Sequence, residues 1–155
     1  MKKKKFEVYI IILLLLLISI YIYFQTVHSP TTPLSTDNNA TIWNGEQNLN
    51  KQTTDTPKIA IPGITSLVFH ADTTEQKVNF YNPEENDCLF LMRLYVNDKS
   101  YWESGYVESG KGYYTITLSE PIPLGTYTAH LQVQCFKEDG TALNSANVEF
   151  NLNVE

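Results

Sequence analysis

Apolar and polar residues alternate along much of the chain after position 58, and this alternation predicts β-strands. The clearest example is the C-terminal stretch, where every second residue is apolar: Val148, Phe150, Leu152 and Val154. Similar alternation covers residues 66–71, 77–80 and 114–118, and in the last of these Tyr114 and Ile116 are expected to face inward. A period of two is typical of strands with one buried and one solvated face.

Turn-forming pairs separate these stretches at regular intervals. They are Asn82-Pro83, Asn97-Asp98, Ser109-Gly110, Leu124-Gly125 and Asp139-Gly140. Such pairs favour tight turns, and no stretch after residue 58 keeps a helical period. About seven short strands in roughly 100 residues have the size and rhythm of an immunoglobulin-like antiparallel β-sandwich, so residues 58–155 are predicted to form an all-β domain of that kind.

The N-terminus has a different pattern. Residues 8–24 are an uncharged apolar run of 17 residues that follows four lysines, Lys2 to Lys5. As a helix this run would be about 26 Å long, enough to cross the hydrocarbon core of a bilayer. Because no small-x-small cleavage site follows Phe24, residues 1–24 are predicted to be a cytoplasmic basic tip and an uncleaved signal-anchor transmembrane helix. The lysines would stay inside, which places the rest of the chain outside the cell membrane.

Residues 25–57 are rich in Ser, Thr, Asn, Gln, Asp and Pro, and they are predicted to form a flexible extracytoplasmic linker. Within them, Ile42 and Trp43 form an isolated apolar pair. A partly exposed pair is the simpler interpretation, and a short docking peptide is the alternative.

Charge divides the chain at residue 24. Residues 1–24 carry four lysines and one glutamate, a net of +3, whereas residues 25–155 carry seven basic and sixteen acidic residues, a net of −9; together they give the −6 of the whole chain. An acidic ectodomain is unsuited to nucleic acid, whose binding depends on neutralising phosphates. It is equally unsuited to lying flat on anionic lipid.

The two cysteines, Cys88 and Cys135, suggest a register for two strands. If they lie opposite each other on antiparallel strands, one face of the pair is apolar throughout. The opposed residues on that face are Phe90 with Val133, Met92 with Leu131, Leu94 with Ala129 and Val96 with Tyr127. An even number of cysteines in an oxidising compartment favours a disulfide between Cys88 and Cys135, and two buried free thiols are the alternative.

Catalytic chemistry has little support. The sequence has no nucleophile elbow, P-loop, dinucleotide fingerprint or HExxH motif, so we expect neither an enzyme nor a cofactor. Two acidic loops, predicted to lie at one end of the sandwich, are weak Ca²⁺ candidates; their residues are Glu84, Glu85, Asp87, Glu138 and Asp139. Ordinary solvated turns are the simpler explanation, since no ordered Asp-x-Asp ligand series is present.

A candidate binding patch lies on two neighbouring predicted strands. A tight turn at 97–100 would place Tyr95 opposite Trp102 and Leu91 opposite Tyr106, with Arg93 between them. Exposed aromatic residues around an arginine are typical of binding surfaces. A slip of the hairpin by one residue would instead turn Trp102 and Tyr106 into the core.

The chain resembles small membrane-anchored extracytoplasmic proteins of Gram-positive bacteria that carry one immunoglobulin-like domain. The resemblance rests on Tyr81-Asn82-Pro83 closing one strand, on Cys88 opening the next, and on Leu124-Gly125-Thr126-Tyr127 opening the strand of the second cysteine. It departs from antibody domains at Tyr127, which lies eight residues before Cys135 rather than two. The resemblance implies a cell-surface interaction module without an active site. We therefore expect the domain to bind a protein partner or to serve as an accessory subunit of an envelope assembly. The alternative function is a carbohydrate-binding sandwich that holds a glycan with Trp102 and Tyr106.

Overall fold

The computed structural model describes residues 13–23, 34–46 and 59–155, which belong to two units, residues 1–32 and 33–155. Residues 13–23 are helical, and each large apolar side chain among them is at least 52 % exposed. Within the described ranges, none of the helical structure is both long and apolar enough to span a bilayer. Residues 8–12 and 24 of the expected membrane span lie outside the described ranges.

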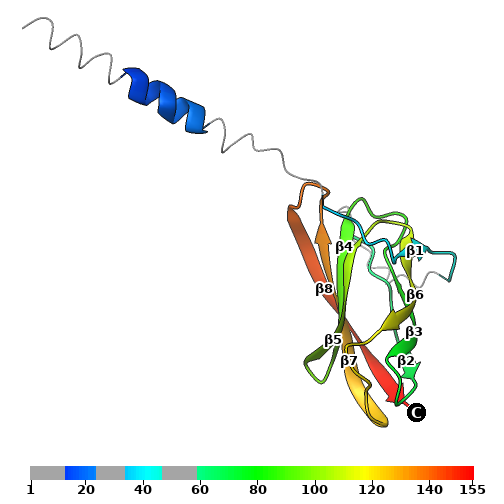
Figure 1. The fold of residues 1–155 in the computed structure, drawn as a ribbon. Helices are drawn as coiled ribbons and strands as arrows, with labels where there is room; N and C mark the ends of the chain where they lie inside the picture. The colour runs from blue at the N-terminus through cyan, green and yellow to red at the C-terminus, as the bar shows by residue number, and fades with distance from the viewer. Residues whose placement is uncertain (1–12, 24–33, 47–58) are drawn as a thin grey trace, which may run out of the picture. The chain divides into compact units, whose positions relative to one another are not determined.

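The second unit consists of two β-sheets (Figure 1). Its strands are β1 (Thr41–Ile42), β2 (Ser66–Phe69), β3 (Glu75–Tyr81), β4 (Leu89–Val96), β5 (Lys99–Val107), β6 (Lys111–Thr117), β7 (Gly125–Phe136) and β8 (Ala142–Val154). The larger sheet has the order β2-β8-β7-β4-β5 and the smaller one the order β1-β6-β3. All neighbours are antiparallel except β2 and β8, which are parallel. The expected all-β sandwich, with seven strands after residue 58, is therefore confirmed.

The predicted turns fall between strands. β4 and β5 are joined by Asn97 and Asp98 alone, both with positive φ, as a two-residue type I′ turn requires. Gly110 and Gly140 also have positive φ in the β5–β6 and β7–β8 connections. These glycines adopt that backbone conformation without the steric cost that a Cβ would bring.

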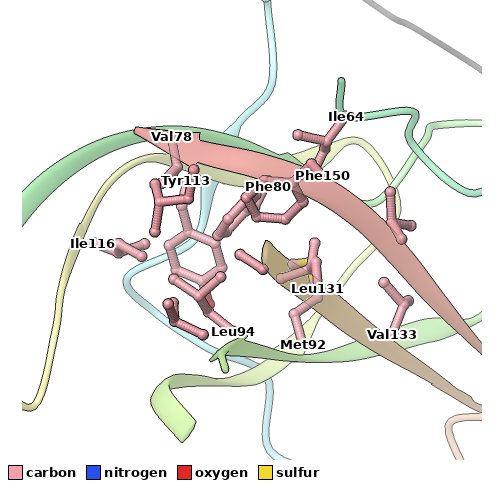
Figure 2. Close-up of a cluster of buried hydrophobic side chains, with 14 of the residues drawn as sticks. Ile64, Val78, Phe80, Met92, Leu94, Tyr113, Ile116, Leu131, Val133 and Phe150 are labelled. Atoms are coloured by element: carbon pink, nitrogen blue, oxygen red, sulfur yellow. The ribbon is translucent and has the colours of Figure 1, made fainter. Parts of the chain in front are cut away.

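The two sheets enclose one apolar core. Alternate residues of β4 and β7 are completely or almost completely buried, and they meet side chains of the smaller sheet such as Phe80 and Tyr113 (Figure 2). One inward-facing assignment was wrong: Tyr114 is exposed, and its neighbour Tyr113 is buried instead. The change has a structural cause, because β3 is irregular between Lys77 and Phe80 and its pairing with β6 shifts there.

The predicted register of β4 and β7 was wrong by two residues. Phe90 pairs with Cys135 and Leu94 with Leu131, so Cys88 is not opposite Cys135. A shift of two keeps every side chain on its own face, and for this reason the same apolar residues still form the core. The apolar pattern had identified the faces of the strands but did not distinguish between two registers that preserve them.

The predicted flexible linker 25–57 was wrong for residues 34–46, which we call the strap. Ala40 is buried in the core cluster, and β1 forms the edge of the smaller sheet by pairing with β6. The backbone N–H of Asp37 donates to the Tyr106 carbonyl at 2.8 Å, and that of Trp43 donates to the Gly110 carbonyl at 2.8 Å. The strap is thus part of the sandwich, and the rest of the expected linker, residues 25–33 and 47–57, lies outside the described ranges.

Tyr127 fixes the start of β7. Its hydroxyl donates a hydrogen bond to the Pro123 carbonyl, four residues upstream, at 2.9 Å. This is the bond that a tyrosine corner makes, although the spacing of Tyr127 from the second cysteine differs from that in antibody domains.

Candidate interaction surface

The outer face of the larger sheet carries most of the residues expected in the binding patch. Leu91, Arg93 and Tyr95 project from β4 on this face and are half-buried, as their alternation with the buried Met92 and Leu94 requires. Tyr106 of β5 is paired with Leu91, as predicted. Its ring meets that of Phe136 of β7 edge-on, with centroids 5.3 Å apart, and Phe136 is a member of the patch that the sequence did not suggest.

Trp102 does not belong to this patch, and its predicted pairing with Tyr95 was wrong. It pairs with Leu94 and turns toward the smaller sheet. There its ring lies 5.8 Å from that of Phe80 and packs edge-on against Tyr113 at 5.0 Å. The sequence had left two orientations open for the hairpin. Trp102 faces inward, as the slipped hairpin predicted, whereas Tyr106 faces outward, as the unslipped hairpin predicted.

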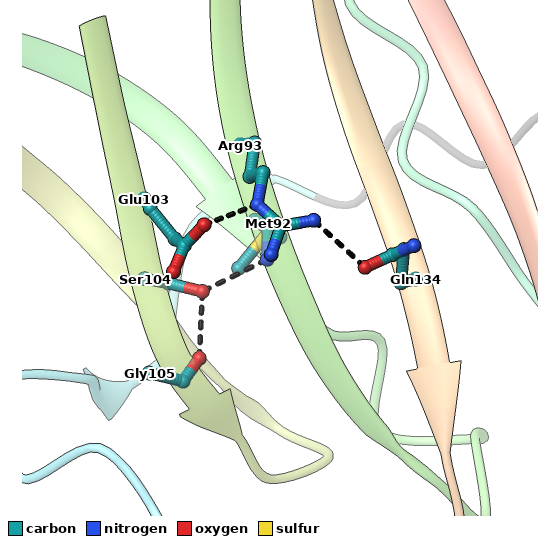
Figure 3. A network of polar contacts seen from close by, with 6 residues as sticks. All are labelled: Met92, Arg93, Glu103, Ser104, Gly105 and Gln134. Atoms are coloured by element: carbon teal, nitrogen blue, oxygen red, sulfur yellow. Dashed lines mark hydrogen bonds and ion pairs between the residues drawn. The ribbon is translucent and has the colours of Figure 1, made fainter. Parts of the chain in front are cut away.

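Two irregularities in the β4–β5 pairing explain why Trp102 faces inward and Tyr106 faces outward. Pairing shifts once between Leu94 and Tyr95 and again between Leu91 and Arg93. At the second shift the Met92 N–H donates to the Ser104 Oγ at 2.9 Å, and the Ser104 hydroxyl donates to the Gly105 carbonyl at 2.6 Å (Figure 3). Ser104 thereby satisfies a backbone donor that the bulge would otherwise leave buried and unpaired.

Arg93 occupies the centre of the patch. Its Nε forms an ion pair with Glu103 of β5, and its guanidinium donates to the Gln134 Oε1 of β7 at 2.9 Å (Figure 3). Beside it, Tyr95 stacks on His130 with ring centroids 4.8 Å apart and planes 12° apart. Neighbours on the two flanking strands, β5 and β7, thus hold Arg93 and Tyr95 in place, which lowers the entropy that a partner would have to remove on binding.

The acidic loops, which were weak Ca²⁺ candidates, are not gathered into a metal site in the described part of the chain. Asn82 and Asn86 point inward: the Asn82 amide donates to the Cys88 and Val107 carbonyls, and Asn86 bonds both backbone groups of Ala60 and the Asn82 Oδ1. Their side-chain oxygens therefore have hydrogen-bond partners within the fold. Across the described parts of the chain, no group of three or more acidic, histidine or cysteine side chains is arranged to hold a metal ion.

The carboxylates of these loops are divided among several places. Glu84 borders a hollow of about 330 Å³ beside Trp43. Asp87 and Glu138 border another, of about 290 Å³, together with Cys88 and Glu108. Asp139 accepts the Thr141 N–H at 2.8 Å, and hydrogen bonds from the side chain and then the backbone of Thr141 lower its pKa. Glu85 is exposed on the β3–β4 loop and borders neither hollow.

The cysteines are buried thiols, and no disulfide joins them in the structure. The two cysteines are not opposite in register, but the Cys135 thiol donates a hydrogen bond to the Cys88 sulfur. This hydrogen bond lowers the pKa of Cys88, and its effect outweighs burial and the nearby Asp87 carboxylate, which both act to raise the pKa. The contact with Cys88, together with burial, raises the pKa of Cys135. The two thiols therefore contact each other, as the sequence analysis expected, although the strands pair in a different register.

The strap makes contacts with both sheets that sequence analysis missed. The Asp37 Oδ2 accepts the Gly105 N–H at 2.7 Å and the Tyr113 hydroxyl at 2.6 Å. Burial acts to raise the pKa of Asp37, but hydrogen bonds from Tyr113, Asn39 and Gly105 outweigh it and hold the pKa below its ordinary value. A Cβ at position 105 would lie only 2.9 Å from the Asp37 Cβ, so this close approach requires glycine.

Trp43 is the second anchor of the strap. Its ring stacks on Tyr81 at 4.7 Å and on Tyr114 at 4.4 Å, and the Asn44 N–H donates to the Tyr114 hydroxyl at 2.8 Å. The apolar Ile42-Trp43 pair within a polar stretch was the one signal in the sequence that could have indicated this contact, although a partly exposed pair was the simpler interpretation and holds for Ile42. The outward turn of Tyr114, which the alternation did not predict, provides the surface for it.

Comparison of the chain with protein families, curated proteins and solved structures finds no match. The functional argument therefore rests on the geometry of the chain itself.

Proposed function

We propose that this chain is a single-pass, membrane-anchored cell-surface module that binds a protein partner through the outer face of its larger sheet and catalyses no reaction. The observation that carries the proposal is the gathering of Leu91, Tyr95 and Tyr106 around Arg93 on that face. Tyrosine and arginine are the residues that most often dominate binding at protein interfaces. The flatness of a sheet face also suits another folded protein better than a small ligand, which favours a concave pocket.

The immunoglobulin-like class is part of the proposal. In the larger sheet, β8, β7, β4 and β5 follow one another as strands G, F, C and C′ do in a variable-type domain. β3 and β6 are neighbours, as strands B and E are. The strand beside β6 is the N-terminal β1, in the place where an immunoglobulin domain has strand D.

Membrane anchoring is supported by the sequence and by the composition of the helical residues 13–23. Their large side chains are apolar around the whole circumference and exposed, a distribution that water disfavours and lipid accepts. Lys2 to Lys5 would hold the N-terminus in the cytoplasm and leave the sandwich outside.

Topology is tested with protease added to intact cells that produce the full chain. We expect the sandwich to be released into the medium while an N-terminal fragment stays in the membrane. Protection of the sandwich in intact cells, or secretion of a mature chain that starts near residue 26, would contradict the anchored arrangement.

The binding surface is tested by placing a photo-crosslinking residue at position 95 or 106, with the exposed position 115 of β6 on the smaller sheet as the control. We expect one protein to be captured from positions 95 and 106 and not from 115, and Arg93→Ala to reduce its capture. An identical set of products from all three positions, or none from 95 and 106, would argue against this face as the binding surface.

The carbohydrate alternative depended on Trp102 and Tyr106 forming one exposed platform. Because Trp102 packs against Phe80 and Tyr113, that platform does not exist, and we do not propose a glycan site there.

A further inference from the structure

Cys88 and Cys135 differ in their access to solvent. Cys88 is 9 % exposed and borders the hollow of about 290 Å³ that Asp87, Leu89, Glu108, Ser109 and Glu138 also line. Cys135 is 2 % exposed and is not among the residues that line the hollow. A reagent in the hollow can therefore reach Cys88 first, whereas Cys135, which contacts Cys88, is shielded from the hollow.

We propose that Cys88 and Cys135 are a redox-active pair in which Cys88 reacts with small disulfides that enter the hollow and Cys135 then completes an intramolecular bond. The proposal concerns a modification site and does not depend on the membrane anchor or on the binding surface described above.

The reaction has two exchange steps, each an attack of a thiolate on a disulfide sulfur. First, the Cys88 thiolate attacks one sulfur of a disulfide RSSR; the RS–SR bond breaks, and one RS⁻ leaves and takes up a proton. Second, Cys135 gives its proton to water and its thiolate attacks the Cys88 sulfur of the mixed disulfide, releasing the second RS⁻. In total two protein thiols are oxidised by two electrons, and one RSSR is reduced to two RSH.

The order of reaction agrees with the electrostatics of the pair. The hydrogen bond from Cys135 lowers the pKa of Cys88, so the thiolate forms on the sulfur that borders the hollow. Contact with Cys88 and burial raise the pKa of Cys135, which keeps it protonated until the first step has consumed the Cys88 thiolate.

The lining of the hollow also selects the reagent. Three carboxylates, those of Asp87, Glu108 and Glu138, border it, and Lys111 offsets part of the Glu108 charge through an ion pair. The local field is therefore negative and favours a cationic disulfide over an anionic one. This identifies the preferred oxidant class as a small disulfide that carries amino groups.

The test uses the full chain in a non-ionic detergent and compares cystamine, a dication, with dithiodipropionate, a dianion of matched length. Each rate is divided by the rate for the urea-unfolded chain, which removes the difference in intrinsic reactivity. We expect the remaining preference for cystamine to be about tenfold at low salt and to shrink at high salt. Glu138→Gln should reduce the preference, whereas Glu149→Gln, on the outer face of β8, should not.

The order of attack is read from acid-quenched samples by peptide mapping. We expect the first mixed disulfide on Cys88, then a Cys88–Cys135 bond; in Cys135→Ser the reaction should stop at modified Cys88. Mapping the wild-type chain keeps the test valid if this variant folds poorly. Initial modification of Cys135, or a normalised rate that is equal for the two reagents, would overturn the proposal.

Discussion

A hydrogen bond of 2.6 Å from the Tyr113 hydroxyl to the Asp37 carboxylate joins two residues that are 76 positions apart in the chain. Asp37 belongs to the strap, and Tyr113 belongs to the wall of the core, where it also packs against Trp102. The same carboxylate oxygen accepts the Gly105 N–H beside the β5 bulge. One side chain thus connects the strap to both sheets.

Replacement of Asp37 by asparagine keeps the shape of the side chain and removes its charge. We expect the free energy of unfolding to fall by about 1–3 kcal/mol, because hydrogen bonds to a charged acceptor in a partly buried site are lost or weakened. Urea unfolding of the full chain in detergent measures the change. Asp139→Asn is the control, since that carboxylate also accepts a backbone N–H but lies in an exposed turn; equal losses in the two variants would contradict a special role for Asp37.

Acid should loosen the strap. The pKa of Asp37 is lower in the folded chain than its ordinary value of 3.8. The ionised Asp37 carboxylate therefore makes its full contribution to folding stability above pH 3.8, and this contribution is lost as the pH falls through the pKa of the folded chain. Hydrogen exchange of residues 34–46 should therefore be constant from neutral pH to about pH 4, after correction for intrinsic rates, and rise below it. The rise should be absent in Asp37→Asn, and an unchanged acid response in that variant would assign it to another group.

Trp102 and Tyr106 should respond oppositely to truncation. Trp102→Ala removes a ring packed on Phe80 and Tyr113 and should cost about 3 kcal/mol of stability, as for other core aromatics. Tyr106→Ala should cost clearly less, because that ring lies on the outer face. The two free energies are measured by urea unfolding, and a larger loss for Tyr106 would reverse the assignment of faces.

The β5 bulge should depend on the Ser104 hydroxyl. In Ser104→Ala the Met92 N–H loses its acceptor in a buried place, which should cost about 1–3 kcal/mol and speed the hydrogen exchange of that amide. Ser100→Ala, at an exposed position of the same strand, serves as the control. Normal protection of Met92 in Ser104→Ala would show that another acceptor replaces the hydroxyl.

The strands and turns were predictable because they depend on local pattern. Alternation identified the buried faces of β4, β7 and β8, and Asn97-Asp98 identified the hairpin turn. Register was not predictable to the same degree, because pairing Phe90 with Cys135 or with Val133 gives the same faces. Only the geometry of the connecting loops and the packing of the whole core separate these two possibilities.

The binding patch shows a second limit. A regular hairpin must place Trp102 and Tyr106 on the same face, and the bulge that lies between them places them on opposite faces. The bulge at Met92 depends on a contact with Ser104 that alternation cannot reveal. The strap was missed for a similar reason: its polar sequence lacks a pattern of its own, and its structure comes from partners about 70 residues away.

Because β1 covers the edge of β6, the folding domain begins near residue 34 rather than at residue 58, where the sequence pattern alone would place the boundary. A fragment that starts at residue 58 would expose the backbone donors and acceptors of β6 and remove the ring that stacks on Tyr81 and Tyr114. Unpaired sheet edges recruit strands from other molecules. Such a fragment should therefore self-associate. A fragment that retains the strap supplies its own edge strand and should not associate through the edge of β6.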